Sequence, residues 1–93
     1  MDFQRSKEVI DLYRAILSLE SEDECMKFLD DVLTPKEISD IAQRLKAAHM
    51  LSEGKSYLEV SLETGMSTAT ISRVSKALER GEGYKTVIDR LKY

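Results

Sequence analysis

The stretch from residue 56 to residue 78 constrains this chain more than any other, because two short helical patterns meet in it at one glycine. Ser56 can cap the first helix, and Glu59, three residues later, completes a capping box. This helix is predicted to stop at Gly65, since glycine tolerates the left-handed backbone that a sharp turn after a helix usually needs. The stretch therefore predicts two short helices joined by a tight turn.

The second of these helices is predicted to have two different faces. Ser67 can cap it, and Ile71, Val74 and Leu78 stand at i, i+3 and i+7, which makes one apolar stripe. The opposite face is small, hydroxylated or basic, as a recognition helix requires for base edges and phosphates. The candidate DNA-binding residues are Ser67, Thr68, Ala69, Thr70, Ser72, Arg73 and Lys76. The spacing predicts a helix-turn-helix over about residues 56–80, and a plain helical hairpin is the simpler alternative.

Length and composition indicate one folded helical domain. The 93 residues suit a single domain, so residues 1–93 are predicted to form one helical DNA-binding domain. Every apolar pattern has a helical period and no stretch alternates as a strand should, so the fold class is all-α with six helices. A lone chain of this size buries only a modest core, and association would supply much of its stability.

The net charge of −3 is unfavourable for binding nucleic acid, but the charge is unevenly distributed. Residues 18–40 contain eight acids and two lysines, which gives a local charge of −6. Residues 41–93 contain nine bases and six acids, which gives +3. Phosphate attraction depends on the nearby patch, because salt screens charges more than about 10 Å away. An acidic first part would therefore weaken non-specific DNA binding without abolishing specific binding.

The sequence offers little to an enzyme or a metal site. Its one histidine, His49, has no Cys or acidic residue at ligand spacing, and with one His and one Cys no nucleophile, base and orienter can be assembled. The four glycines mark turns and form no phosphate-binding loop. We therefore predict a protein that is not an enzyme and uses no metal or other cofactor.

Cys25 and the N-terminus bear on where the protein works. Cys25 is the only cysteine and falls in an apolar helical stripe, so we expect it to be buried. The N-terminus lacks the apolar core of a signal peptide, and no run approaches the ~18 apolar residues of a membrane span. These features predict a cytoplasmic protein with no membrane partner.

Four further helices are predicted outside the central motif. The first covers residues 3–17, and its apolar face is wide enough to meet its own domain and a partner subunit together, although a tight monomeric bundle is the alternative. Capping boxes at Ser21–Glu24 and Thr34–Glu37 open the second and third helices. The last helix follows Gly81. The third helix should carry its main apolar stripe on Ile38, Ile41, Ala42, Leu45 and Ala48.

Three segments together resemble the Trp-repressor family in order and spacing: V-L-T-P-K-E, A-Q-R-L-K and G-M-S-T-A-T-I-S-R. They are most similar to its branch called YerC/YecD, and the resemblance runs from about residue 28 to residue 78. It implies an all-helical, interlocked homodimer that binds operator DNA through its helix-turn-helix. Thr68, Ala69, Thr70 and Ser72 match the positions that face DNA in the Trp repressor.

The resemblance also implies a candidate effector pocket. Arg44 and Arg73 match the two arginines beside the family's tryptophan ligand, and Thr34 matches a residue at the edge of that pocket. Val74, however, stands where the Trp repressor has a glycine against the indole, and Ala77 stands where it has a serine. Tryptophan is therefore not expected to bind, and whether another small molecule does so stays open.

These observations together predict a sequence-specific, homodimeric transcriptional regulator, a repressor by resemblance. Arg73 and Lys76 would contact phosphates, and Thr68, Ala69 and Thr70 would meet base edges. The alternative is a helical protein–protein interaction module that no longer binds DNA, which the net acidity favours.

Overall fold

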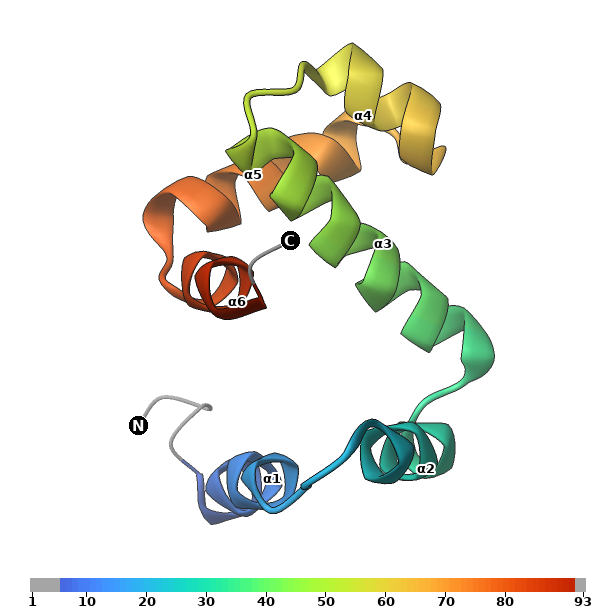
Figure 1. Cartoon of the computed structure of the whole chain (residues 1–93), viewed down its shortest axis with the longest axis vertical. Coiled ribbons are helices and arrows are strands. Elements are labelled where there is room, and N and C mark those ends of the chain that lie inside the picture. The colour runs from blue at the N-terminus through green and yellow to red at the C-terminus, as the bar shows by residue number, and fades with distance from the viewer. Residues whose placement is uncertain (1–5, 92–93) are drawn as a thin grey trace. The chain divides into compact units, whose positions relative to one another are not determined.

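The computed structural model describes residues 6–91, and this part of the chain folds into helices with no strand. The helices are α1 (Lys7–Leu17), α2 (Glu22–Val32), α3 (Pro35–Ser52), α4 (Tyr57–Thr64), α5 (Thr68–Arg80) and α6 (Gly83–Leu91), as labelled in Figure 1. The all-α prediction is confirmed. The chain divides into two compact units, Met1–Ile38 and Ser39–Tyr93, and the division falls within α3.

Local hydrogen bonds explain where most helices begin. The Thr34 N–H donates to Glu37 Oε1 at 2.9 Å, and the Glu37 N–H donates to Thr34 Oγ1 at 3.1 Å, so the predicted capping box opens α3. The same pair of bonds joins Ser56 and Glu59 at the start of α4, at 2.8 and 3.1 Å. Each box satisfies two amide groups that a helix start leaves without a partner.

The box predicted for α2 forms differently. The Glu24 N–H donates to Ser21 Oγ at 3.1 Å, as expected. The Glu24 carboxylate, however, accepts the N–H of Glu20 at 2.8 Å, one residue before the cap. The acid therefore ties down the loop between α1 and α2 and not the cap residue itself.

In the first unit α1 begins later than predicted. Ser6 has an extended backbone and its Oγ accepts the Val9 N–H at 3.3 Å, so the helix starts at Lys7. The prediction of a start at residue 3 is wrong at residue 6, and residues 3–5 lie outside the described part of the chain. The serine ends the helix because its hydroxyl replaces a turn of backbone bonding.

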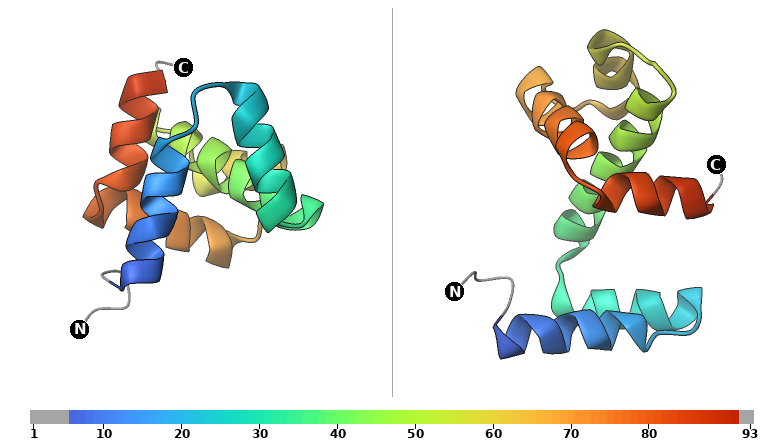
Figure 2. Two further views of the ribbon diagram at one scale, coloured as in Figure 1. Left: turned by 90° about the horizontal axis from the view of Figure 1, so that it is seen from below. Right: turned by 90° about the vertical axis from the view of Figure 1, so that its left-hand side faces the viewer.

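The two helices α1 and α2, joined by a short loop in Figure 2, bury no residue. Cys25 is exposed, so the prediction that it is buried is wrong for the single chain. Two short helices cannot cover apolar faces of this width by themselves. The apolar residues of α1 that remain exposed are Ile10, Leu12, Tyr13, Ile16 and Leu17, at 37%, 45%, 44%, 48% and 83%.

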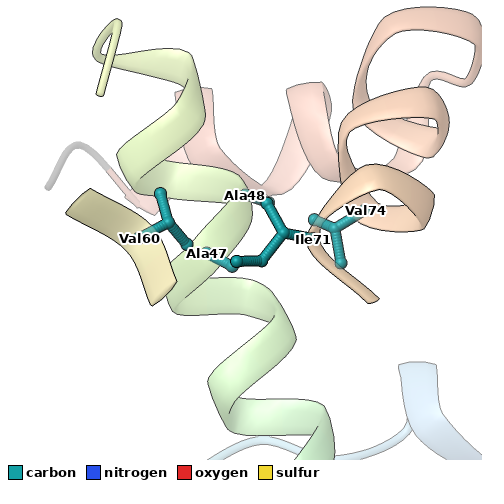
Figure 3. Close-up of a cluster of buried hydrophobic side chains, with 5 residues drawn as sticks. All are labelled: Ala47, Ala48, Val60, Ile71 and Val74. Carbon is teal, nitrogen blue, oxygen red and sulfur yellow. The ribbon is translucent and has the colours of Figure 1, made fainter. Parts of the chain in front are cut away.

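The second unit has a small core built on two alanines of α3. Ala47 and Ala48 are completely buried, and their size lets the neighbouring helices approach closely. Figure 3 shows Val60 of α4 beside Ala47, and Ile71 of α5 between Ala48 and Val74. Val60 and Ile71 are completely buried, and Val74 is 4% exposed. This core fixes α4 and α5 against α3.

Other parts of the α3 stripe are uncovered. Ile41, predicted to lie in the core, is 51% exposed, and Ala42 is also exposed. The buried side of α3 lies one turn further along, because α4 and α5 pack on its C-terminal half. Tyr84 and Ile88 of α6 are half-buried and pack against the same core.

Candidate nucleic-acid interface

The turn between α4 and α5 is held by Gly65 and by two hydroxyl groups. Gly65 has φ 74° and ψ 4°, the left-handed conformation predicted for it. Its N–H donates to the Ser61 carbonyl at 2.8 Å, and Ser61 Oγ donates to the Met66 carbonyl at 2.9 Å. Thr64 Oγ1 donates to the Val60 carbonyl at 2.7 Å and accepts the Met66 N–H at 3.2 Å. The turn therefore has one defined geometry.

The start of α5 is fixed by its cap. Ser67 has an extended backbone, and its Oγ accepts the N–H of Thr70 at 3.2 Å. The same hydroxyl donates to Thr70 Oγ1 at 3.1 Å. Ser67 and Thr70, both predicted to bind DNA, are therefore bonded to each other. Thr68 and Ala69 between them are exposed at the first turn of the helix.

The two faces of α5 differ as predicted. Ile71 and Val74 enter the core, whereas Arg73 and Lys76 are exposed on the opposite face. Ser72 and Thr70 are half-buried at the boundary. The helix thus presents small side chains at its start and cations further along, which suits an approach to base edges and phosphates.

Arg44 and Arg73 line one cavity of about 340 Å³ in the second unit. Neither guanidinium makes an ion pair or hydrogen bond with any residue in the described range 6–91. The other lining residues are Thr70, Val74, Ala77 and Tyr84. Two unpaired cations beside hydroxyl groups make this cavity suited to an anion.

The sequence predicted part of this cavity. Its two arginines come together, and Val74 and Ala77 form part of its wall. Thr34, the third predicted pocket residue, belongs to the first unit, where its hydroxyl caps α3. Tyr84 was not predicted to line the cavity, because its place depends on how the chain turns between α5 and α6, which no local pattern specifies.

Two other properties were searched for in residues 6–91. No three His, Cys, Asp or Glu side chains come together there as a metal site would need. None of the helices in this range combines the length and apolarity needed to cross a lipid bilayer.

Comparison with known proteins gives the relationship of the whole chain. The family model described as Trp repressor protein matches residues 7–92. The uncharacterized protein YerC of Bacillus subtilis is 47% identical over 93 residues, which cover 99% of this chain and 89% of YerC.

Two solved structures are closely similar. A crystal structure of a TrpR-like protein from Eubacterium eligens matches with a TM-score of 0.91 and 44% identity, covering 96% of this chain and 93% of that one. A candidate Trp repressor from Staphylococcus aureus matches with a TM-score of 0.89 and 42% identity, covering 95% and 89%. The chain therefore belongs to the Trp repressor family of helical DNA-binding regulators, within its YerC-related branch.

Proposed function

We propose that this protein is a homodimeric, sequence-specific transcriptional repressor that acts on operator DNA in the cytoplasm, with residues 1–93 working as one domain. The observation that supports this most is the division of α5. Its apolar residues Ile71 and Val74 are used to fix the helix on the core, while Thr68 and Ala69 are exposed at its start. A helix held in this way can place its first turn in a major groove.

The proposed contacts follow from the side chains. Thr68 and Ala69 are small and exposed, so they allow a close approach to base edges, and a methyl group can contact thymine. Thr70 would meet a base edge while Ser67 holds it in place. Arg73 and Lys76 would bind phosphates, and Ser72 would lie at the edge of the contact surface.

A homodimer is proposed from the uncovered apolar surfaces. The face of α1 described above buries nothing within its own unit. In the second unit an apolar groove of about 760 Å³ is lined by Ile41, Leu45, Ala77 and Val87 together with other residues. A second copy of the chain can cover such surfaces, and a two-fold dimer would present two α5 helices to half-sites about one helical turn, ~34 Å, apart.

Tryptophan is proposed not to act as an effector. Val74 is 4% exposed and packs in the core, so its side chain both forms the cavity wall and fixes α5. An indole there would have to displace it, and overpacking of this kind costs about 1–3 kcal/mol. Arg44 and Arg73 have no acidic partner in residues 6–91, so an anion such as a DNA phosphate is the better explanation for the pair.

Selection of bound fragments from random DNA by the purified protein tests this function. A two-fold symmetric enriched motif is expected, together with weaker binding as salt rises, because phosphate contacts release counterions. Recovery of no motif at several salt concentrations would contradict the proposal. It would favour the alternative of a protein–protein interaction module, for which the net charge of −3 is the supporting observation.

A further inference from the structure

The first helix of the helix-turn-helix carries an apolar surface that no other helix of its unit covers. Val60 is completely buried, but Leu58 and Leu62 are 67% and 79% exposed, and Tyr57 is 41% exposed. Leu58 and Leu62 are four residues apart and so lie one turn apart on the same face. Single exposed leucines are ordinary, whereas neighbouring ones mark a contact surface. We refer to Tyr57, Leu58 and Leu62 as the α4 patch.

A shallow cavity of about 530 Å³ adjoins the α4 patch. Leu62 and Met50 supply its apolar part. Its charged lining residues have both signs, and they are Lys46, Glu53, Lys55, Glu59 and Glu63. The patch therefore has an apolar centre beside a mixed charged rim, which is the usual composition of a protein–protein contact.

Several of these rim charges have geometry that leaves them available. Lys46 Nζ lies 3.3 Å from Glu63 Oε1, but both side chains are about half exposed, at 47% and 59%, so the pair contributes little by itself. The Lys55 side chain makes no ion pair or hydrogen bond with the part of the chain spanning residues 6–91. It is therefore free to meet an acid of another molecule.

The mixed rim favours a second copy of this chain as the occupant. In a two-fold contact the same surface lies on both sides, so each cation must find an acid within the same patch. The rim supplies both, with Lys55 near Glu53 and Glu63. A partner charged with a single sign would oppose like charges over part of the rim.

The place of α4 in the motif suggests where such a contact forms. In a helix-turn-helix the first helix crosses the DNA backbone while the second lies in the groove. Proteins on neighbouring sites of one duplex are held at a high effective concentration, so a contact smaller than the ~1,200 Å² of a stable complex is enough. We propose that neighbouring dimers on DNA contact each other through their α4 patches and bind cooperatively. This inference rests on the proposed DNA-binding function.

The test uses the full-length protein and two sets of DNA fragments. One fragment carries a single selected site, and the others carry two sites whose separation increases by one base pair through a full helical turn. We expect independent binding on most fragments and, at one rotational phase, binding to the second site about tenfold tighter or more. Leu62→Gln removes the apolar side chain but keeps a good helix former, and Leu62→Met is the matched control that stays apolar.

The outcomes separate the inference from the proposed function. Loss of cooperativity in Leu62→Gln, its retention in Leu62→Met, and unchanged single-site affinity in both would support the α4 contact. Independent binding by the parent protein at every spacing, or cooperativity that survives Leu62→Gln, would overturn it while leaving the proposed function intact. Absence of binding to the single-site fragment would overturn both, and only that result would count against DNA binding itself.

Discussion

Ser61 Oγ donates a hydrogen bond of 2.9 Å to the carbonyl of Met66 and so bridges the turn between α4 and α5. The bond joins the third turn position of one helix to the residue that leads into the next. Together with the left-handed Gly65, it sets the direction in which α5 leaves the turn. The small side chain of Ser61 is needed for this, because a larger one would separate the two helices.

Ser61→Ala is expected to lower the free energy of unfolding by about 1 kcal/mol, the usual contribution of one hydrogen bond. The melting temperature should fall by about 4–8 °C for a chain of this size. Ser52→Ala is the matched control, because Ser52 Oγ also donates to a carbonyl, that of His49 at 2.6 Å, but at an exposed helix end. Equal melting temperatures for Ser61→Ala and Ser52→Ala would show that the bridge does not stabilise the turn.

Ala69→Glu is expected to abolish specific DNA binding. It places a carboxylate at the exposed start of α5, where it would face bases and phosphates, while Ile71 and Val74 stay in the core. Binding to a selected site, measured by fluorescence anisotropy, should fall by more than tenfold with little change in melting temperature. Thr86→Glu adds the same charge to the exposed side of α6 and should bind nearly as the parent does. Parent-like affinity of Ala69→Glu would mean that α5 does not enter the groove.

Ile16→Asp is expected to shift the protein from dimer to monomer. Ile16 is 48% exposed on the apolar face of α1, and a charge there would be buried without a partner in the dimer. Sedimentation at tens of micromolar should show a dimer for the parent and a monomer for the variant. Asp11→Ala, which only removes the exposed Lys7–Asp11 pair, should stay dimeric. A monomeric parent, both free and on DNA, would exclude the proposed dimer.

L-Tryptophan is expected to produce no binding heat at sub-millimolar concentrations and no change in DNA affinity. The valine at position 74 occupies space that an indole would need, and a ligand that does not bind one state better than another cannot shift their balance. Isothermal titration calorimetry and DNA binding with and without the amino acid provide the measurements. In Val74→Gly, binding heat or tighter DNA binding would identify the Val74 side chain as the block. Either effect in the parent protein would contradict the prediction.

The sequence predicted best those features that depend on neighbouring residues. The capping boxes of Thr34–Glu37 and Ser56–Glu59 formed because each acid lies three residues after its cap, a distance that the helix itself sets. Gly65 adopts φ 74° for an equally local reason. Ile71 and Val74 are buried because a helical period brings them to one face.

The features that sequence could not predict depend on what covers a surface. Cys25 and Ile41 both fall in apolar stripes, yet both are exposed in the single chain, since a stripe shows that a face needs covering and not which element covers it. Tyr84 lines the arginine cavity only because the chain turns back after α5. The roles of Arg73 and Lys76 on DNA stay predictions.

The absence of any buried residue in α1 and α2 has a consequence for how much of the protein a cell can keep. If the proposed dimer covers these helices, a newly made chain that has not met a partner has no core there and opens readily to proteases. Degradation would then remove unpaired chains first, and the lifetime of each chain would increase with the number of chains present. The amount of active regulator would rise more steeply than its rate of synthesis, so a modest change in expression would produce a sharp change in operator occupancy.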